Sequence, residues 1–234
     1  MSLPPSRIAL SASLLGGCTW LAAMRLVKKS RVAALLGAGV AVTLGMDGAH
    51  FVRMALGDLS RVLRRLPRRS VLEEDRARFR VWPSDIDRNG HCNNAKFVRV
   101  ANYARRSFWA RCGAWAECLR HEPKVNLIVT ATTIRYRREL KLFDSYEVVS
   151  RLRYWDAKCF YTEHRFVKDD FVHAIQHVKY RVVGSGPIKT PADLLRAVSS
   201  DTFDSPPSLD AMPELQAWIQ YDAASSAALR PSTP

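Results

Sequence analysis

The chain is 234 residues long and 47% apolar, which is enough for one domain of about 150 residues with a hydrophobic core, plus an extension. Its 36 Lys and Arg residues outnumber 22 Asp and Glu residues, and the formal net charge of +14 suits nucleic acid, an anionic membrane or an acidic ligand. No nucleic-acid-binding motif accompanies this charge, and the five cysteines form no Cys-x-x-Cys pair, which argues against a nucleic-acid partner, a disulfide framework and a cysteine zinc site.

Two uncharged apolar runs, residues 8–24 and 32–46, lie near the start of the chain and are 17 and 15 residues long. Both are at or below the short limit for a membrane-spanning helix. Three interpretations remain open: one anchor followed by an amphipathic or partly buried helix, a two-helix membrane hairpin, or a basic organelle-targeting extension. We favour a retained membrane anchor or targeting segment over residues 1–55, rather than core helices of a soluble domain.

Basic residues crowd the segment that follows. Six arginines lie between positions 53 and 69, whereas the first acidic residue of the chain is Asp47. An anionic leaflet would attract such a cluster, so residues 56–75 are predicted to form a basic juxtamembrane helix and linker, with the helix pattern ending at Pro67. The protein is therefore expected at a membrane, in the endoplasmic reticulum or in mitochondria.

A dense polar segment separates a short strand from a long helix. Residues 78–82 alternate as a half-buried strand does, and residues 85–94 then hold two carboxylates, one histidine and three asparagines. Asn93 or Asn94 is a good N-cap for the helix that follows, and Gly113 can end it. The apolar stripe of this helix consists of Phe97, Ala101, Ala104, Phe108 and Cys112. The polar segment should therefore lie at the positive end of a buried helix, where negative charge is stabilised.

Strand patterns dominate the second half of the chain. They cover residues 125–137, 146–154, 159–168 and 171–183, with a tight hairpin expected at residues 169 and 170. One strand, a long helix and then a run of antiparallel strands predict an α+β fold in which the sheet wraps around the helix. His173 and His177 are four residues apart on one predicted strand, and His164 lies on another. Two residues four apart on a strand are about 13 Å apart, which is too far to share one metal ion. A zinc site is therefore disfavoured.

Two further helices are predicted near the C-terminus. Residues 191–199 are expected to form a short helix, and residues 213–229 a longer one that begins with proline at its first position. The apolar side of the longer helix should cover an exposed edge or face of the sheet.

The polar segment also carries a recognisable spacing. The residues Asp85, Asp87, Gly90, His91, Asn93, Asn94 and Phe97 together resemble the signature of hotdog-fold acyl thioesterases of the 4-hydroxybenzoyl-CoA thioesterase and acyl-ACP thioesterase type. Residues 134–140, 144–148 and 206–229 are similar to the membrane-anchored thioesterase superfamily member six type of eukaryotic protein. The resemblance covers about the C-terminal two thirds of the chain. It implies a single hotdog domain over residues 76–185, a C-terminal extension over residues 186–234, and a homodimer with its sites at the shared interface.

The resemblance also assigns roles to residues. It implies that Asp87 is the catalytic carboxylate, acting either as nucleophile or as base for water, and that Asn89 and His91 position the water or the substrate carbonyl. Three further residues are expected to shape the substrate-binding pocket and the helix start: Gly90, Asn93 and Asn94. The backbone N–H groups of residues 90–93 are expected to stabilise the oxyanion.

These assignments predict a membrane-anchored thioesterase that hydrolyses fatty acyl thioesters of CoA or, as a second choice, of an acyl carrier protein, with no cofactor and no metal. The alternative function is a catalytically weak hotdog protein that binds acyl chains or a partner protein. Taken singly, the same residues have a structural explanation, in which Asp87 closes an Asx-turn and the asparagines are caps. Cys92 lies inside the motif but is expected to be a small buried thiol rather than a nucleophile.

Overall fold

A computed structural model of the chain describes residues 48–64, 67–122, 125–184, 186–199 and 205–229, together with 32–34, 37, 39 and 40. The chain divides into two compact units, Met1–Ser60 and Arg61–Pro234. Most of the two apolar runs predicted near the N-terminus lies outside the described residues. Among the residues that are described, no helix combines the length and apolar character needed to cross a membrane. The domain boundaries predicted at residues 55, 75 and 185 stay predictions.

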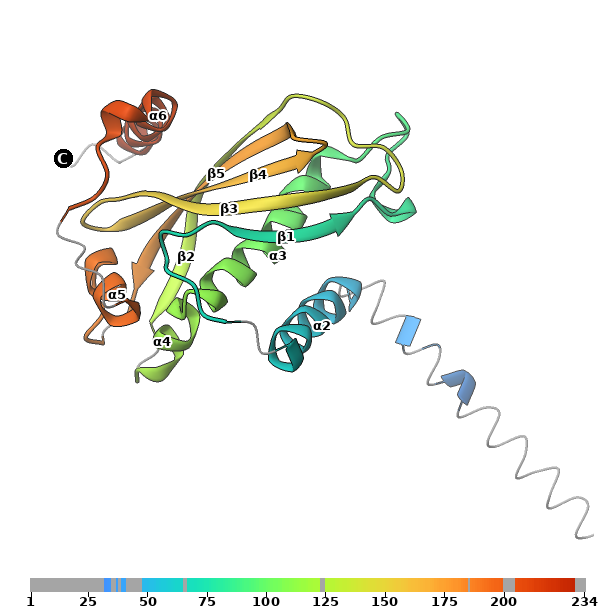
Figure 1. Cartoon of the computed structure of the whole chain (residues 1–234), viewed down its shortest axis with the longest axis horizontal. Helices are drawn as coiled ribbons and strands as arrows, with labels where there is room; N and C mark the ends of the chain where they lie inside the picture. Colours follow the sequence, from blue (N-terminus) through green and yellow to red (C-terminus); the bar gives the residue numbers. More distant parts are fainter. Residues whose placement is uncertain are drawn as a thin grey trace, which may run out of the picture. The chain divides into compact units, whose positions relative to one another are not determined.

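The second unit is built on one antiparallel sheet with the strand order β1-β3-β4-β5-β2. Its strands are β1 (Asp75–Arg80), β2 (Asn126–Tyr136), β3 (Ser145–Trp155), β4 (Cys159–Lys168) and β5 (Phe171–Val183). The long helix α3 (Asn94–Arg111) lies against one face of this sheet, as Figure 1 shows. This is the hotdog arrangement that the sequence predicts. The four later strands agree with the predicted ranges to within one residue, whereas β1 begins three residues before the predicted strand at residues 78–82 and ends two residues before it.

Both faces of β4 are covered, one by α3 and the other by the C-terminal helix. Its even-numbered side chains face α3, and both Phe160 and Phe166 are completely buried in the core on that side. Its odd-numbered side chains face the opposite side, where Tyr161 is packed beneath the C-terminal helix. β4 is therefore buried on both faces at the centre of the sheet.

The turn between β4 and β5 is the tight hairpin that the sequence predicts. Asp169 and Asp170 are its two central residues and have positive φ angles of 49° and 56°, and the flanking residues Lys168 and Phe171 pair directly. Two successive positive φ angles are characteristic of a type I′ turn, whose twist matches that of the two strands it joins.

α3 has the predicted ends and the predicted buried stripe. Asn93 is the N-cap, and the apolar residues at positions 97, 101, 104, 108 and 112 are all buried. Gly113 follows with φ +83° and stops the helix, as expected for a left-handed residue. A second helix, α4 (Ala114–Arg120), starts immediately after it. α4 is not evident from the sequence, because seven residues are too few to establish a helical period.

Two helices follow the sheet, as predicted. α5 (Pro191–Val198) begins with a capping box between Thr190 and Asp193. α6 (Pro213–Ala228) follows a short 3₁₀ turn, η2 (Leu209–Ala211), and lies on the face of the sheet opposite α3 (Figure 1). Its Leu215 is fully buried against β4. α6 therefore covers the outer face of the sheet rather than one of its edges.

Candidate active site

The polar motif folds into a small hairpin loop between η1 (Pro83–Asp85) and the start of α3. Ile86 and Cys92 pair as an isolated antiparallel bridge. Within the loop, the Asp87 N–H donates to the His91 carbonyl at 3.1 Å, and the Gly90 N–H donates to the Asp87 carbonyl at 3.0 Å. Gly90 has φ +79°, a conformation that favours glycine. The loop therefore presents residues 87–91 beside the amino end of a buried helix.

The Asp87 side chain is half-buried, and its two oxygens differ. Oδ1 accepts the backbone N–H of Asn89 at 2.8 Å, which closes an Asx-turn. Oδ2 accepts no hydrogen bond from the residues that the structure describes. One oxygen therefore fixes the orientation of the carboxylate, and the other is available to a substrate or a water molecule.

Asp85, two residues earlier, has a structural role. Its side chain is buried, Oδ2 accepts the Trp82 N–H at 2.9 Å, and Oδ1 lies 3.5 Å from Lys96 Nζ. Its backbone carbonyl accepts the Asn93 N–H at 2.8 Å. Asp85 thus joins η1 to the helix start, and the two carboxylates of the motif differ in their surroundings.

The other predicted site residues lie in or next to the same loop. Asn89 is exposed, and His91 is half-buried with Nδ1 at 3.4 Å from the Cys92 carbonyl. Asn93 caps α3, because its Oδ1 accepts the Ala95 N–H at 2.9 Å. Asn94 is exposed, and its carbonyl accepts the Tyr136 hydroxyl at 3.0 Å.

The predicted oxyanion donors need a correction. The N–H groups of Gly90 and Asn93 are already bonded within the motif, and the Cys92 N–H donates to the Leu140 carbonyl at 2.8 Å. The loop needs these bonds to close and to attach to the β2–β3 connection. Within the described part of the chain, the backbone N–H groups of His91 and Asn94 have no acceptor. Asn94 is the first residue of α3, so its N–H lies at the positive end of the helix.

Cys92 is the buried thiol that the sequence predicts. It is 4% exposed, and burial, together with the nearby Asp85 charge, raises its pKa to about 12. The side chain is therefore a protonated thiol at neutral pH, and a nucleophile would need the thiolate.

A charged pocket of about 320 Å³ lies beside the loop. It is lined by Arg138, Glu139, Lys141, Asp144, Lys168, Asp169, Phe171 and His173. Lys141 pairs with His91 in an isolated bridge, which connects the pocket to the motif. The buried His173 donates its Nδ1–H to the Glu139 carbonyl at 2.9 Å. Asp87 is not among the lining residues, and the mixed charges suit a polar ligand group rather than an acyl chain.

The three strand histidines do not converge on one point. His164 lies on the inner face of the sheet, where its ring nitrogens contact Ser150 Oγ at 2.9 Å and Thr162 Oγ1 at 3.1 Å. It is completely buried, and this burial lowers its pKa to about 3, so the ring is neutral at neutral pH. His177 lies on the outer face of the sheet instead, beside Trp218 of α6.

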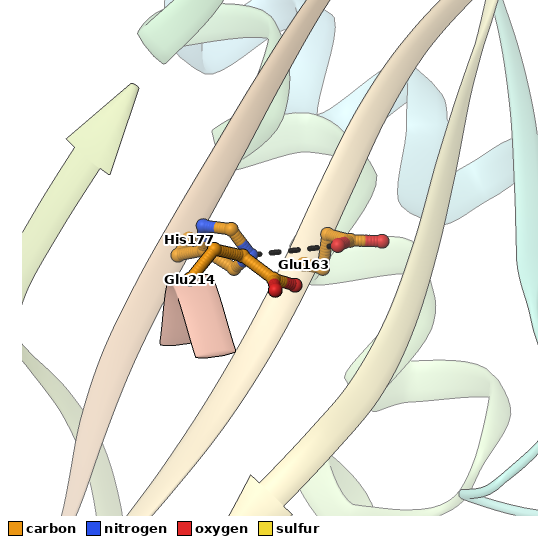
Figure 2. A group of neighbouring side chains, drawn as sticks. All are labelled: Glu163, His177 and Glu214. Carbon is orange, nitrogen blue, oxygen red and sulfur yellow. Dashed lines mark ion pairs between the residues drawn. The ribbon is translucent and has the colours of Figure 1, made fainter. Parts of the chain in front are cut away.

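A cluster on the outer face could offer ligands to a metal ion. Glu163 of β4, His177 of β5 and Glu214 of α6 place their candidate ligand atoms within 4.8 Å of one another. Figure 2 shows His177 and Glu163 facing each other across two neighbouring strands, with His177 Nε2 3.4 Å from a carboxylate oxygen. This cluster is not evident from the spacing of the histidines in the sequence, because its members come from three separate elements.

Guanidinium groups already occupy this cluster. The Glu163 carboxylate lies 2.8 Å from Arg151 Nε, 2.7 Å from Arg153 Nη1 and 2.7 Å from Arg165 Nε. Arg153 also reaches Glu214 at 3.4 Å. These guanidinium groups take up the Glu163 oxygens and repel a metal ion. We therefore assign the cluster a structural role, in which it joins the sheet to α6.

Replacing Asn93 with Ala is expected to lower the free energy of unfolding by about 1 kcal/mol, because the Ala95 N–H loses its acceptor. Urea denaturation of the parent and the variant measures the difference. Asn93→Asp, which retains an acceptor oxygen, should be within about 0.5 kcal/mol of the parent. Equal losses for Ala and Asp would contradict the capping role.

Comparisons with known proteins identify relatives of this chain. A family model described as the thioesterase-like superfamily matches residues 81–219. Protein THEM6 of Xenopus laevis is 33% identical over 202 residues, covering 85% of this chain and 92% of the relative. Protein THEM6 of Danio rerio is 36% identical over 166 residues, covering 70% of this chain and 78% of the relative.

Solved structures with a similar chain path include a gentisyl-coenzyme A thioesterase, with 21% identity and a TM-score of 0.45 over 54% of this chain and 100% of that chain. A hypothetical protein of Aquifex aeolicus has 21% identity and a TM-score of 0.47 over 53% of this chain and 99% of that chain.

Proposed function

Because the chain belongs to the thioesterase-like superfamily, we propose that it hydrolyses fatty acyl-CoA thioesters to a free fatty acid and CoA. The observation that carries this proposal is the Asp87 carboxylate. One of its oxygens is held by the Asn89 N–H, and the other is free of protein donors among the described residues. The loop that holds it lies directly before the amino end of α3. A carboxylate fixed in this way beside a helix start suits attack on a carbonyl carbon.

The proposed reaction can follow two routes. In the first, Asp87 Oδ2 attacks the acyl carbon, the CoA thiolate leaves, and water then hydrolyses the mixed anhydride. In the second, Oδ2 takes a proton from a water molecule, the resulting hydroxide attacks the acyl carbon directly, and the CoA thiolate leaves as the tetrahedral intermediate collapses. Both routes place negative charge on the carbonyl oxygen. We assign stabilisation of this charge to the Asn94 N–H at the helix start, together with the His91 N–H.

We assign the side chains of Asn89 and His91 to positioning the water or the carbonyl. Gly90 allows the close approach of the loop backbone, while Asn93 and Asn94 shape the helix start. These roles rest on the placement of the residues in one loop, and on the spacing that the loop shares with acyl thioesterases.

Membrane anchoring and pairing belong to the same proposal. We propose that residues 1–55 hold the enzyme at a membrane, where long acyl chains are available, and that two copies join at an edge of the sheet. β1 and β2 are the two edge strands of the described sheet. β2 is the longer of them, with eleven residues, and offers more unpaired backbone groups to a second copy.

The test is an assay of the purified full chain in detergent micelles against acyl-CoAs of increasing chain length and an acyl carrier protein thioester. Release of the free thiol reports turnover. We expect hydrolysis of acyl-CoA substrates and a preference among chain lengths. Tight binding of acyl-CoA without thiol release would instead support the alternative function, a hotdog protein that binds acyl chains.

A further inference from the structure

The helix α2 (Gly48–Arg64) has two faces of different character. Six of its large apolar side chains lie on one side of the helix, and Met54, which is less exposed, lies on the other. Each of the six is more than half exposed: Phe51 57%, Val52 59%, Leu56 59%, Leu59 52%, Val62 72% and Leu63 72%. An exposed stripe of this kind is unusual for a protein surface in water and marks an interaction site.

The charges of α2 identify the kind of surface that it fits. Arg53 and Arg61 lie roughly 120° and 160° around the helix from Leu59, at about 100° per residue. Asp58 is the single acidic residue of the helix, whose first turn has none. A protein groove that received this stripe would need only apolar complementarity. A bilayer surface with anionic headgroups can bury the apolar stripe among its acyl chains and attract the arginines with its negative charge.

The described residues of α2 do not form a membrane span. The helix has 17 residues, several of them charged, and lacks the length and apolar character of a spanning helix. A helix with a wide apolar face and a basic polar face instead lies in the plane of the interface. At a rise of about 1.5 Å per residue it would cover about 25 Å of membrane surface.

We propose that α2 is an in-plane lipid-binding helix, which inserts its apolar stripe among the headgroups of an anionic leaflet. This goes beyond the anchoring proposed for residues 1–55, because it assigns a defined surface and a lipid class to residues 48–64. It is also independent of catalysis, so loss of lipid binding by α2 would leave the proposed chemistry at Asp87 intact.

The experiment measures amide hydrogen exchange of residues 48–64 in the full chain, on vesicles of phosphatidylcholine alone and on vesicles containing roughly one-third phosphatidylserine. Because the readout is confined to these residues, binding through the upstream segment does not obscure it. We expect exchange in this segment to slow by roughly ten-fold or more on the anionic vesicles. Raising the ionic strength from about 0.1 M to about 1 M should reduce this protection, because salt screens the arginines.

Two variants with the same added charge provide the comparison. Leu59→Glu places a carboxylate at the centre of the apolar stripe and should abolish the slowing. Gly57→Glu places one on the opposite side, where an added Cβ would meet nothing within 4 Å, and should retain it to within about two-fold.

Three results would overturn the proposal. They are equal protection on neutral and anionic vesicles, equal behaviour of the two variants, and protection without vesicles that Leu59→Glu removes. The third result, accompanied by a drop in molecular mass in solution, would mean that a second copy covers the stripe. Without a change in mass, it would mean that another part of the same chain covers it.

Discussion

Replacing Asp87 with Asn is expected to lower the kcat for acyl-CoA hydrolysis by a factor on the order of 10³, because the amide can neither attack the acyl carbon nor deprotonate water. The fold should be unaffected. Asn retains the side-chain oxygen that accepts the Asn89 N–H at 2.8 Å, and Asn suits an Asx-turn as well as Asp does. Thiol release under saturating substrate measures the loss, and urea denaturation should find the free energy of unfolding within about 0.5 kcal/mol of the parent.

Asp85→Asn is the matched control, because this carboxylate lies two residues away and has the opposite role. Its loss should lower the free energy of unfolding by about 1–3 kcal/mol, since the buried carboxylate accepts the Trp82 N–H with Oδ2 and lies beside Lys96 with Oδ1. Its kcat should fall far less than that of the Asp87 variant. Equal turnover by the Asp87 variant and the parent would remove Asp87 from the mechanism and would favour the acyl-binding alternative.

Replacing Glu163 with Gln is expected to produce the largest loss of stability, about 3–5 kcal/mol in the free energy of unfolding. Glu163 is 2% exposed and is the shared partner of three arginines, so its neutralisation removes the buried negative charge that holds them together and leaves only Glu74 near Arg151 and Glu214 near Arg153. Chemical denaturation of the full chain, followed by tryptophan fluorescence, measures the loss.

The pH dependence of the free energy of unfolding should show the same contribution from the Glu163 carboxylate. Burial raises the pKa of Glu163, but His177 and the three arginines outweigh burial and lower it from 4.5 to about 2. A carboxyl whose pKa is lower in the folded state stabilises the fold above its unfolded pKa, and this stabilisation is lost as the pH falls through the folded value. The parent should therefore lose about 3 kcal/mol between pH 4.5 and pH 2 from this group, and Glu163→Gln should lack that component.

Glu147→Gln is the control for this prediction. Glu147 also contacts two arginines, Arg76 and Arg78, but Arg78 is 89% exposed and the pair lies in water. Its neutralisation should cost less than about 1 kcal/mol. A Glu163 variant that lost no more than the Glu147 variant would contradict the proposed role of the buried cluster.

The sequence predicted the fold well because the fold depends on local patterns. The β4 pattern places Phe160 and Phe166 on one side and Tyr161 on the other, and this alternation is readable without any long-range information. The helix start at Asn93 and the stop at Gly113 follow from the preferences of single residues.

The site was predictable only in part, because its details depend on contacts between distant segments. The spacing of the motif indicated that Asp87, Asn89 and His91 lie in one loop. It could not indicate that the Cys92 N–H donates to the carbonyl of Leu140, which is distant in the sequence. The Glu163 cluster draws residues from β3, β4, β5 and α6, and nothing near Glu163 in the chain marks it as buried. Such clusters become visible only when the strand register is known.

The position of α6 has a consequence for synthesis of the protein. This helix lies near the end of the chain, yet the outer face of β4 depends on it for cover. While the ribosome is still translating α6, the completed sheet exposes an apolar surface around Tyr161 and Cys159 to solvent. Nascent chains at this stage are therefore the form most prone to aggregate, and a premature stop before α6 would make that exposure permanent.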